Sequence, residues 1–330
     1  MKQTLRFATL GLLAAVLLGT STGCIVIPVG DLFKGPPLVE MRLEEGAGVF
    51  EKEKIAIVDI AGVITGNEQS SVLTSSPNTV SEVKTRLDWA ASDPEVKAIV
   101  LRISSPGGEV TACDILYREV KRLREQIKIP VVACIQDTGA SGGYYIAAAS
   151  DHIMAHPTAI VGSIGVILHS FDLSQLLEKL GVKTEPVKSS DMKDLLSFFR
   201  PRTETETQVL KDLVSDMYER FVDAVDEGRP DLTREKILEL ADGRVVSGLR
   251  AAKSGLVDEV GFLDDAIRTA AELAQVDSPT VVRYTRRPQG GSNIYTKASA
   301  PSVAAGTEVT LRIAPESLIP RPQMYFLWTP

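Results

Sequence analysis

Short apolar runs alternate with helix-like segments in the first half of the chain, and this alternation limits the fold more than any other feature. The apolar runs have the length of strands and cover residues 55–60, 98–103 and 131–135. Apolar residues with helical spacing follow the runs, over residues 80–90, 115–123 and 144–149. Strands that alternate with helices form right-handed β-α-β crossovers, so we expect an α/β fold with a largely parallel sheet.

A longer helix is expected after Pro201. Thr203 and Glu206 have the spacing of a capping box, and apolar residues then recur every three or four positions as far as Val225. Such a stripe is typical of any helix that faces a core, so we interpret this helix as structural.

The N-terminus has the pattern of an export signal. Lys2 and Arg6 precede an apolar run at residues 7–18, which is short for a membrane span of about 20 residues. Small residues then lead into Cys24, a pattern that resembles a bacterial lipoprotein signal, in which the cysteine carries the lipid. An uncleaved anchor and ordinary secretion remain alternatives. All three predict that the body of the protein lies outside the cytoplasm, on the periplasmic side.

The net charge disfavours one class of partner, and the cysteines disfavour two kinds of covalent or metal site. The net charge of −7 argues against a nucleic-acid partner, which would require a basic surface. Besides Cys24 the chain has only Cys113 and Cys134, whose spacing forms neither a disulfide framework nor a metal signature. We interpret both as small buried apolar residues.

Two glycine-rich turns each lie between an expected strand and an expected helix. They read SPGG at residues 105–108 and GASGG at residues 139–143. Glycine lets backbone amides approach an anion closely, and the following helix adds the positive end of its dipole. Together the turns suggest that Ser141 is a nucleophile and that the amides of Gly108 and Gly142 form an oxyanion hole.

The general base is the open question for such a serine. The GASGG turn also matches the nucleophile elbow of α/β-hydrolases, whose histidine lies far downstream. The histidines of this chain are His152, His156 and His169, all within eighteen residues, so a Ser-His-Asp triad is disfavoured. Lysine is the main alternative base. Residues 186–194, which follow an expected strand, contain Lys188 and Lys193, and the residues alone do not choose between them.

Four ordered motifs resemble those of the SppA-type signal peptide peptidases over residues 54–270. They are SPGG at 105–108, ASGGYY at 140–145, PTAIVGSIGV at 157–166 and GLVD at 255–258. The resemblance implies a ClpP/crotonase-like fold of repeated β-β-α units, a Ser-Lys dyad, outward-facing membrane attachment, and a ring or dome of copies. By position it makes Ser141 the nucleophile, Lys193 the general base and Ser163 a residue that could orient the lysine.

These features predict four regions. Residues 1–23 are the signal, residues 24–53 a tether and N-terminal extension, and residues 54–275 the catalytic domain. From residue 276 on, helical periodicity vanishes and proline and glycine rise, which predicts a C-terminal tail that packs on a neighbouring subunit.

The function expected from residues and resemblance together is that of a membrane-tethered serine endopeptidase. It would hydrolyse extended apolar peptides, such as released signal peptides, through an acyl-enzyme intermediate and without a metal or cofactor. A crotonase-like enzyme acting on an acyl-CoA thioester would share the paired amides, but the export signal disfavours it because CoA is intracellular. A non-catalytic membrane scaffold is the third possibility.

Overall fold

The computed structural model describes residues 37–44, 52–66, 69–70, 75–76, 78–286, 293–295 and 324–327. The expected signal, Cys24 and most of the expected tether lie outside these ranges. The described residues from Leu38 onward belong to one compact unit. Over the ranges given above, no helix is long and apolar enough to cross a bilayer.

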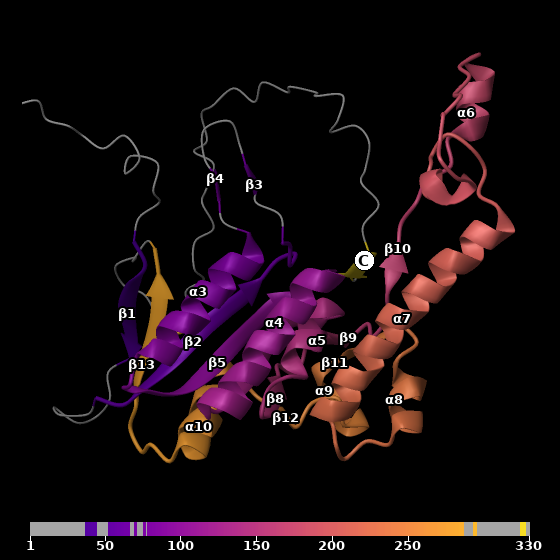
Figure 1. Ribbon diagram of the computed structural model, residues 1–330. Helices are drawn as coiled ribbons and strands as arrows, with labels where there is room; N and C mark the ends of the chain where they lie inside the picture. The colour runs from indigo at the N-terminus through magenta and orange to yellow at the C-terminus, as the bar shows by residue number, and fades with distance from the viewer. Residues whose placement is uncertain are drawn as a thin grey trace, which may run out of the picture. The chain divides into compact units, whose positions relative to one another are not determined.

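A nine-stranded sheet, counted over the described residues, organises the unit (Figure 1). Its main path runs in the order β1 (Val39–Glu44), β13 (Thr280–Thr285), β2 (Lys54–Ala61), β5 (Val96–Ser105), β7 (Val131–Ala140), β8 (His152–Ala155) and β12 (Glu259–Val260). Two more strands, β9 (Ile160–Gly162) and β11 (Val245–Ser247), extend from β7. Only the β1–β13 and β11–β9 pairs of this sheet are antiparallel. The predicted α/β fold with a largely parallel sheet is confirmed.

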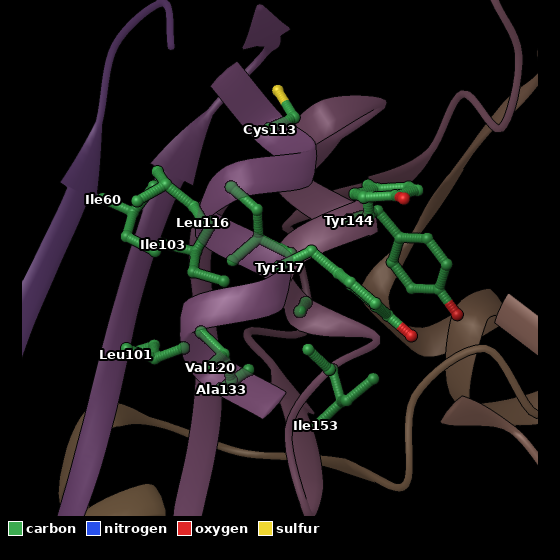
Figure 2. Packing of buried hydrophobic residues seen from close by; sticks show 14 of the residues in the cluster. Ile60, Leu101, Ile103, Cys113, Leu116, Tyr117, Val120, Ala133, Tyr144 and Ile153 are labelled. Carbon is green, nitrogen blue, oxygen red and sulfur yellow. The ribbon is translucent and has the colours of Figure 1, made fainter. Parts of the chain in front are cut away.

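Helices cover both faces of the sheet. On one face lie α3 (Thr79–Ser92), α4 (Val110–Arg122) and α5 (Gly142–Ala147), and α10 (Leu263–Ala274) covers the other. Alternate residues of β2 divide between two clusters, since Val58 faces the first helices and Ile57 faces α10. Figure 2 shows the first cluster, where Leu116 and Val120 of α4 point toward the strands. Burial on both faces explains why these strands are continuous apolar runs in the sequence.

The remaining helices are α6 (Ser174–Lys179), α7 (Glu204–Gly228), α8 (Arg234–Leu240) and α9 (Gly248–Ser254), with a π-helical turn at Leu123–Ile127 and a 3₁₀ turn, η2, at Asp191–Asp194. The predicted capping box of α7 is confirmed: the Thr203 side chain accepts from the Glu206 amide, and the Glu206 carboxylate accepts from the Thr203 amide at 2.8 Å. Of the predicted apolar stripe, Leu210, Phe221 and Val225 are buried, whereas Leu213 is exposed.

Residues beyond 275 contribute strands as well as loops. All six residues of β13 are buried, and β13 pairs parallel with β2 inside the main sheet. A second sheet of three strands has the order β10 (Ile167–Leu168), β14 (Met324–Leu327) and β6 (Gly107–Glu109). Two short strands, β3 (Gln69–Ser70) and β4 (Ser75–Ser76), pair with each other. The strand expected directly before residue 186 is wrong, because residues 182–188 have no regular structure.

Candidate active site

Ser141 lies at the sharp turn from β7 into α5. Its backbone has φ 50° and ψ −118°, a conformation that costs a serine about 1–3 kcal/mol. Two backbone hydrogen bonds hold the turn: the Ser141 amide donates to the Gly162 carbonyl at 2.7 Å, and the Tyr145 amide donates to the Ser141 carbonyl at 2.8 Å. The residue is 1% exposed, and its hydroxyl makes no hydrogen bond with another described residue. A strained strand-to-helix turn of this kind is how hydrolases present a nucleophile.

The two glycine-rich turns meet beside Ser141. A Cβ built on Gly142 would lie 3.2 Å from the Gly108 amide nitrogen and 2.3 Å from Cys113 Sγ. A Cβ built on Gly107, whose φ is 103°, would lie 2.7 Å from the Gly142 amide nitrogen. Only glycine therefore fits where the turns touch. The structure brings together Ser141, Gly108 and Gly142, three of the residues singled out in the sequence.

Hydrogen bonds fix the direction of the Gly108 amide. Ser105 Oγ donates to the Gly62 carbonyl at 2.7 Å and accepts from the Gly107 amide at 3.1 Å. On one side of β6 the Gly107 carbonyl accepts from the Ile64 amide, and the Glu109 amide donates to the Ile64 carbonyl, both at 2.9 Å. Successive groups of a strand alternate in direction, so the Gly108 amide faces the opposite side.

Ser163 lies one strand away from the nucleophile. It directly follows Gly162, which is paired with Ala140 across the β7–β9 ladder. Its φ is 52°, and its amide donates to the Arg244 carbonyl at 2.7 Å. Its hydroxyl, like that of Ser141, makes no hydrogen bond within the described part of the chain. Ser141 and Ser163, both with positive φ, thus directly follow the paired ends of the neighbouring strands β7 and β9.

The structure separates the two candidate lysines by their partners. The Lys188 amine contacts Asp194 at 2.7 Å, and the pKa of Asp194 is lowered by Arg200 first and by Lys188 second. Lys193 lies in η2, where no residue is buried, and its amine has neither an ion pair nor a hydrogen bond with any described residue. No hydrogen bond joins Lys193 to Ser141 in the described ranges.

The histidines have other partners. His156 Nδ1 lies 2.8 Å from Thr158 Oγ1, and its ring packs edge-on against Phe262. His152 faces Glu259, and His169 is exposed. No hydrogen bond connects any of the three to Ser141 among the described residues.

The GLVD motif contacts α5, the helix that follows Ser141. This structural role was not predicted from the sequence. Tyr144, fully buried in α5, donates from its hydroxyl to the Leu256 carbonyl at 2.7 Å. Arg229 donates to both carboxylate oxygens of Asp258, at 2.8 and 2.7 Å, and Asp258 also accepts from the Ile153 amide at 2.7 Å. Burial opposes the charge of Asp258, but the Arg229 guanidinium outweighs it and lowers the pKa. The motif was visible in the sequence, whereas nothing there marked Arg229.

Both described cysteines are free and buried, as predicted. Burial raises the pKa of the Cys113 thiol, and it raises the pKa of Cys134 to about 12. A thiol that stays protonated is a poor nucleophile, so Cys113 fills space beside Gly142.

Comparisons with known proteins give a consistent result. The model of peptidase family S49 matches residues 123–277. A protein of Enterococcus faecium that carries the name signal peptide peptidase SppA is 34% identical over 257 residues, 78% of this chain and 73% of that protein. A protein of Synechocystis sp. named as a protease is 41% identical over 230 residues, 70% of this chain and 78% of that protein. The chloroplastic serine protease SPPA of Arabidopsis thaliana is 32% identical over 260 residues, 71% of this chain but 38% of that protein.

Proposed function

The chain belongs to peptidase family S49 and is a serine protease, and from this premise we propose that it is a membrane-tethered endopeptidase that cleaves extended apolar peptides such as released signal peptides. Ser141 is the nucleophile and Lys193 the general base. The observation that carries the proposal is the meeting of strained Ser141 with the turns that hold Gly108 and Gly142.

The reaction uses these groups in order. Ser141 Oγ attacks the carbonyl carbon of the substrate while the neutral amine of Lys193 takes the hydroxyl proton. The amides of Gly108 and Gly142 donate to the oxygen that becomes negative. The C–N bond breaks as Lys193 returns the proton to the leaving amine. Water then attacks the ester in the same way and releases the second product.

Lys193 is a better candidate base than Lys188 because of their neighbours. An amine held by a carboxylate is less available to contact the serine hydroxyl, and a general base must lie within hydrogen-bond reach of the proton that it takes. Lys188 is held in this way by Asp194, whereas the amine of Lys193 has no such partner in the described ranges.

Assembly of several copies would complete the dyad. Lys193 belongs to a segment between β10 and α7, residues 169–200, which we call the arm. No residue of α6 or η2 in this arm is buried, and its exposed apolar side chains include Phe171, Leu176 and Leu180. We infer that copies associate into a ring or dome through the arm, which desolvates Lys193 and brings it to Ser141.

The site of action follows from the N-terminal signal. A lipid on Cys24, or an uncleaved anchor, would hold the peptidase at the membrane on its periplasmic side, where released signal peptides are encountered.

Three variants of the full-length protein test the proposal. Ser141→Ala is expected to abolish both hydrolysis of a fluorogenic apolar peptide and labelling by a fluorophosphonate probe. Lys193→Met should abolish hydrolysis, whereas Lys188→Met, the matched control in the same segment, should retain it. Full activity of Ser141→Ala would disprove the nucleophile, and an inactive Lys188→Met beside an active Lys193→Met would disprove the base.

A further inference from the structure

Three charged side chains link the turn that carries Lys193 to the beginning of α7. Asp194 directly follows Lys193, Arg200 is the last residue of the arm, and Glu206 lies in the first turn of α7. The Arg200 guanidinium contacts both carboxylates, one six residues before it and the other six residues after it. The general base of the proposed mechanism is therefore next in sequence to this cluster.

Arg200 holds Asp194 at both carboxylate oxygens. Its Nε donates to Oδ2 at 3.0 Å and its Nη2 donates to Oδ1 at 2.7 Å, and Nη2 also lies 3.4 Å from the Asp194 carbonyl oxygen. Lys188 contacts Oδ1 at 2.7 Å, and Asp191, the other acidic residue of η2, is exposed. A two-pronged contact of this kind fixes the direction of a carboxylate as well as balancing its charge.

Glu206 connects Arg200 to a helix that is anchored in the core. Its side chain is 3% exposed, and Arg200 Nη1 donates to Oε2 at 2.9 Å. The same oxygen accepts from the Thr203 amide within the capping box. About four turns farther along α7, Phe221 packs edge-on against Tyr145 of α5, the helix that begins directly after the nucleophile. In Figure 1, α7 extends from the neighbourhood of α6 toward α5.

The charges of the cluster are balanced without Lys193. Arg200 lowers the pKa of Glu206 to about 2, and it is the first cause of the lowered pKa of Asp194, so both carboxylates are ionised at neutral pH. Arg200 and Lys188 supply the two positive charges that match them. With its oxygens occupied, Asp194 makes no ion pair with the neighbouring Lys193 in the part of the chain that the structure describes.

We propose that Arg200 is a positioning residue for the general base: attached to α7 through Glu206, it holds Asp194 and thereby the turn that presents Lys193. It also keeps the Asp194 carboxylate away from the Lys193 amine. This assignment rests on the proposed peptidase function, in which Lys193 takes the proton of Ser141. Arg200 acts on the base through Asp194 and is not itself a catalytic residue.

The pH profile of peptide hydrolysis by the full-length protein tests this role. Only a neutral amine accepts a proton, so kcat/KM falls on the acid side of its optimum. Arg200→Met leaves an unbalanced carboxylate beside Lys193, and the acid-side midpoint of kcat/KM should rise by about one pH unit. At the optimum kcat should fall about a hundredfold with little change in KM, because the base is displaced. A merely structural role would lower the amount of active enzyme without moving the midpoint.

A conservative variant separates charge from geometry, and a distant arginine provides the control. Arg200→Lys keeps the positive charge but loses the fork, so the midpoint should return to the wild-type pH while kcat stays below the wild-type value. Arg234 also pairs with two carboxylates of α7, Glu219 and Asp223, far from Asp194 in sequence. Arg234→Met should therefore leave both kcat and the midpoint unchanged.

The outcomes distinguish this assignment from the proposed function. An unchanged midpoint in Arg200→Met, beside an inactive Lys193→Met, would overturn the positioning role and leave the peptidase intact. If Arg200→Met is inactive, Arg200→Lys decides, because a wild-type kcat in that variant would show that the fork is not needed. Hydrolysis that persists in Lys193→Met would instead refute the proposed base, and with it the mechanism.

Discussion

At the scale of single residues, glycine is required at the site for space. Around Ser141 the positions that would carry a Cβ are already filled by backbone or sulfur atoms: the Ile64 carbonyl oxygen at 1.9 Å for Gly108, and Cys113 Sγ at 2.3 Å for Gly142. The amides reach the reacting carbonyl only because no side chain stands between the turns. The Ile64 carbonyl belongs to the backbone and cannot be removed by substitution, whereas the Cys113 sulfur can be removed. This difference makes the steric explanation testable.

Gly142→Ala is expected to lower kcat/KM about a hundredfold, the usual cost of losing one oxyanion donor. The added methyl group would push against Cys113 Sγ, so the double variant Gly142→Ala/Cys113→Ala should recover a substantial part of the activity. Cys113→Ala alone should remain active. Peptide hydrolysis by the four proteins decides the matter, and a double variant no better than Gly142→Ala would contradict the steric explanation.

The sequence was sufficient to predict the residues that the chain places close together, and insufficient for the rest. Ser141, Gly108 and Gly142 each follow a strand of one parallel sheet, so their meeting at one edge follows from topology. The position of Lys193 depends on the arm, whose contacts lie partly outside a single chain in our proposal. Arg229 was missed because an arginine at a helix end is ordinary until its carboxylate partner, Asp258, is known.

At the scale of elements, some strands could be predicted from the sequence and others could not. β2, β5 and β7 were predictable because burial on both faces makes each a continuous apolar run. β13 contains Arg283 in a fully buried strand, and β14 has only four residues, so neither has a sequence signal of its own. Both are strands because of partners far away in the chain. The ClpP/crotonase-like fold implied by the resemblance is confirmed all the same.

The Arg229–Asp258 pair connects the end of α7 to β8 and the GLVD loop, and its contribution should depend on pH. The folded pKa of Asp258 is lowered, so the stabilisation is present above the unfolded value of about 3.9 and is lost as the pH falls through the folded value. Urea unfolding of the wild type and Asp258→Asn at pH 7, 5 and 3 should show a smaller acid loss in the variant. An identical pH slope would contradict this account.

The same pair should be costly to break at neutral pH. Arg229→Met removes both hydrogen bonds of the guanidinium to the Asp258 carboxylate, whose side chain is 32% exposed, so about 1–2 kcal/mol is the expected loss in the free energy of unfolding. Because Tyr144 in α5 is bound to the same loop, peptidase activity should also fall in this variant. Unchanged stability by urea unfolding at pH 7 would show that the pair does not support the site.

At the scale of the whole molecule, the proposed dyad between copies predicts complementation. Mixing Ser141→Ala with Lys193→Met, each inactive alone, should restore activity when subunits are allowed to exchange. If each site takes its serine from one copy and its lysine from the next, an equal random mixture recovers about a quarter of the wild-type sites. The readout is peptide hydrolysis after dissociation and reassembly. No recovery, with mixed assemblies demonstrated by differential tags, would place both residues of a site in one copy.

The pairing of β6 with β14 joins residues 107–109 to residues 324–327, which lie far apart in the chain. A chain is synthesised from its N-terminus, and contacts between distant residues form late in folding. The strand that carries Gly108 therefore gains this neighbour only after residues 324–327 have been made. A partly synthesised chain would thus lack a finished site, so that the peptidase would become active only near the end of its own synthesis.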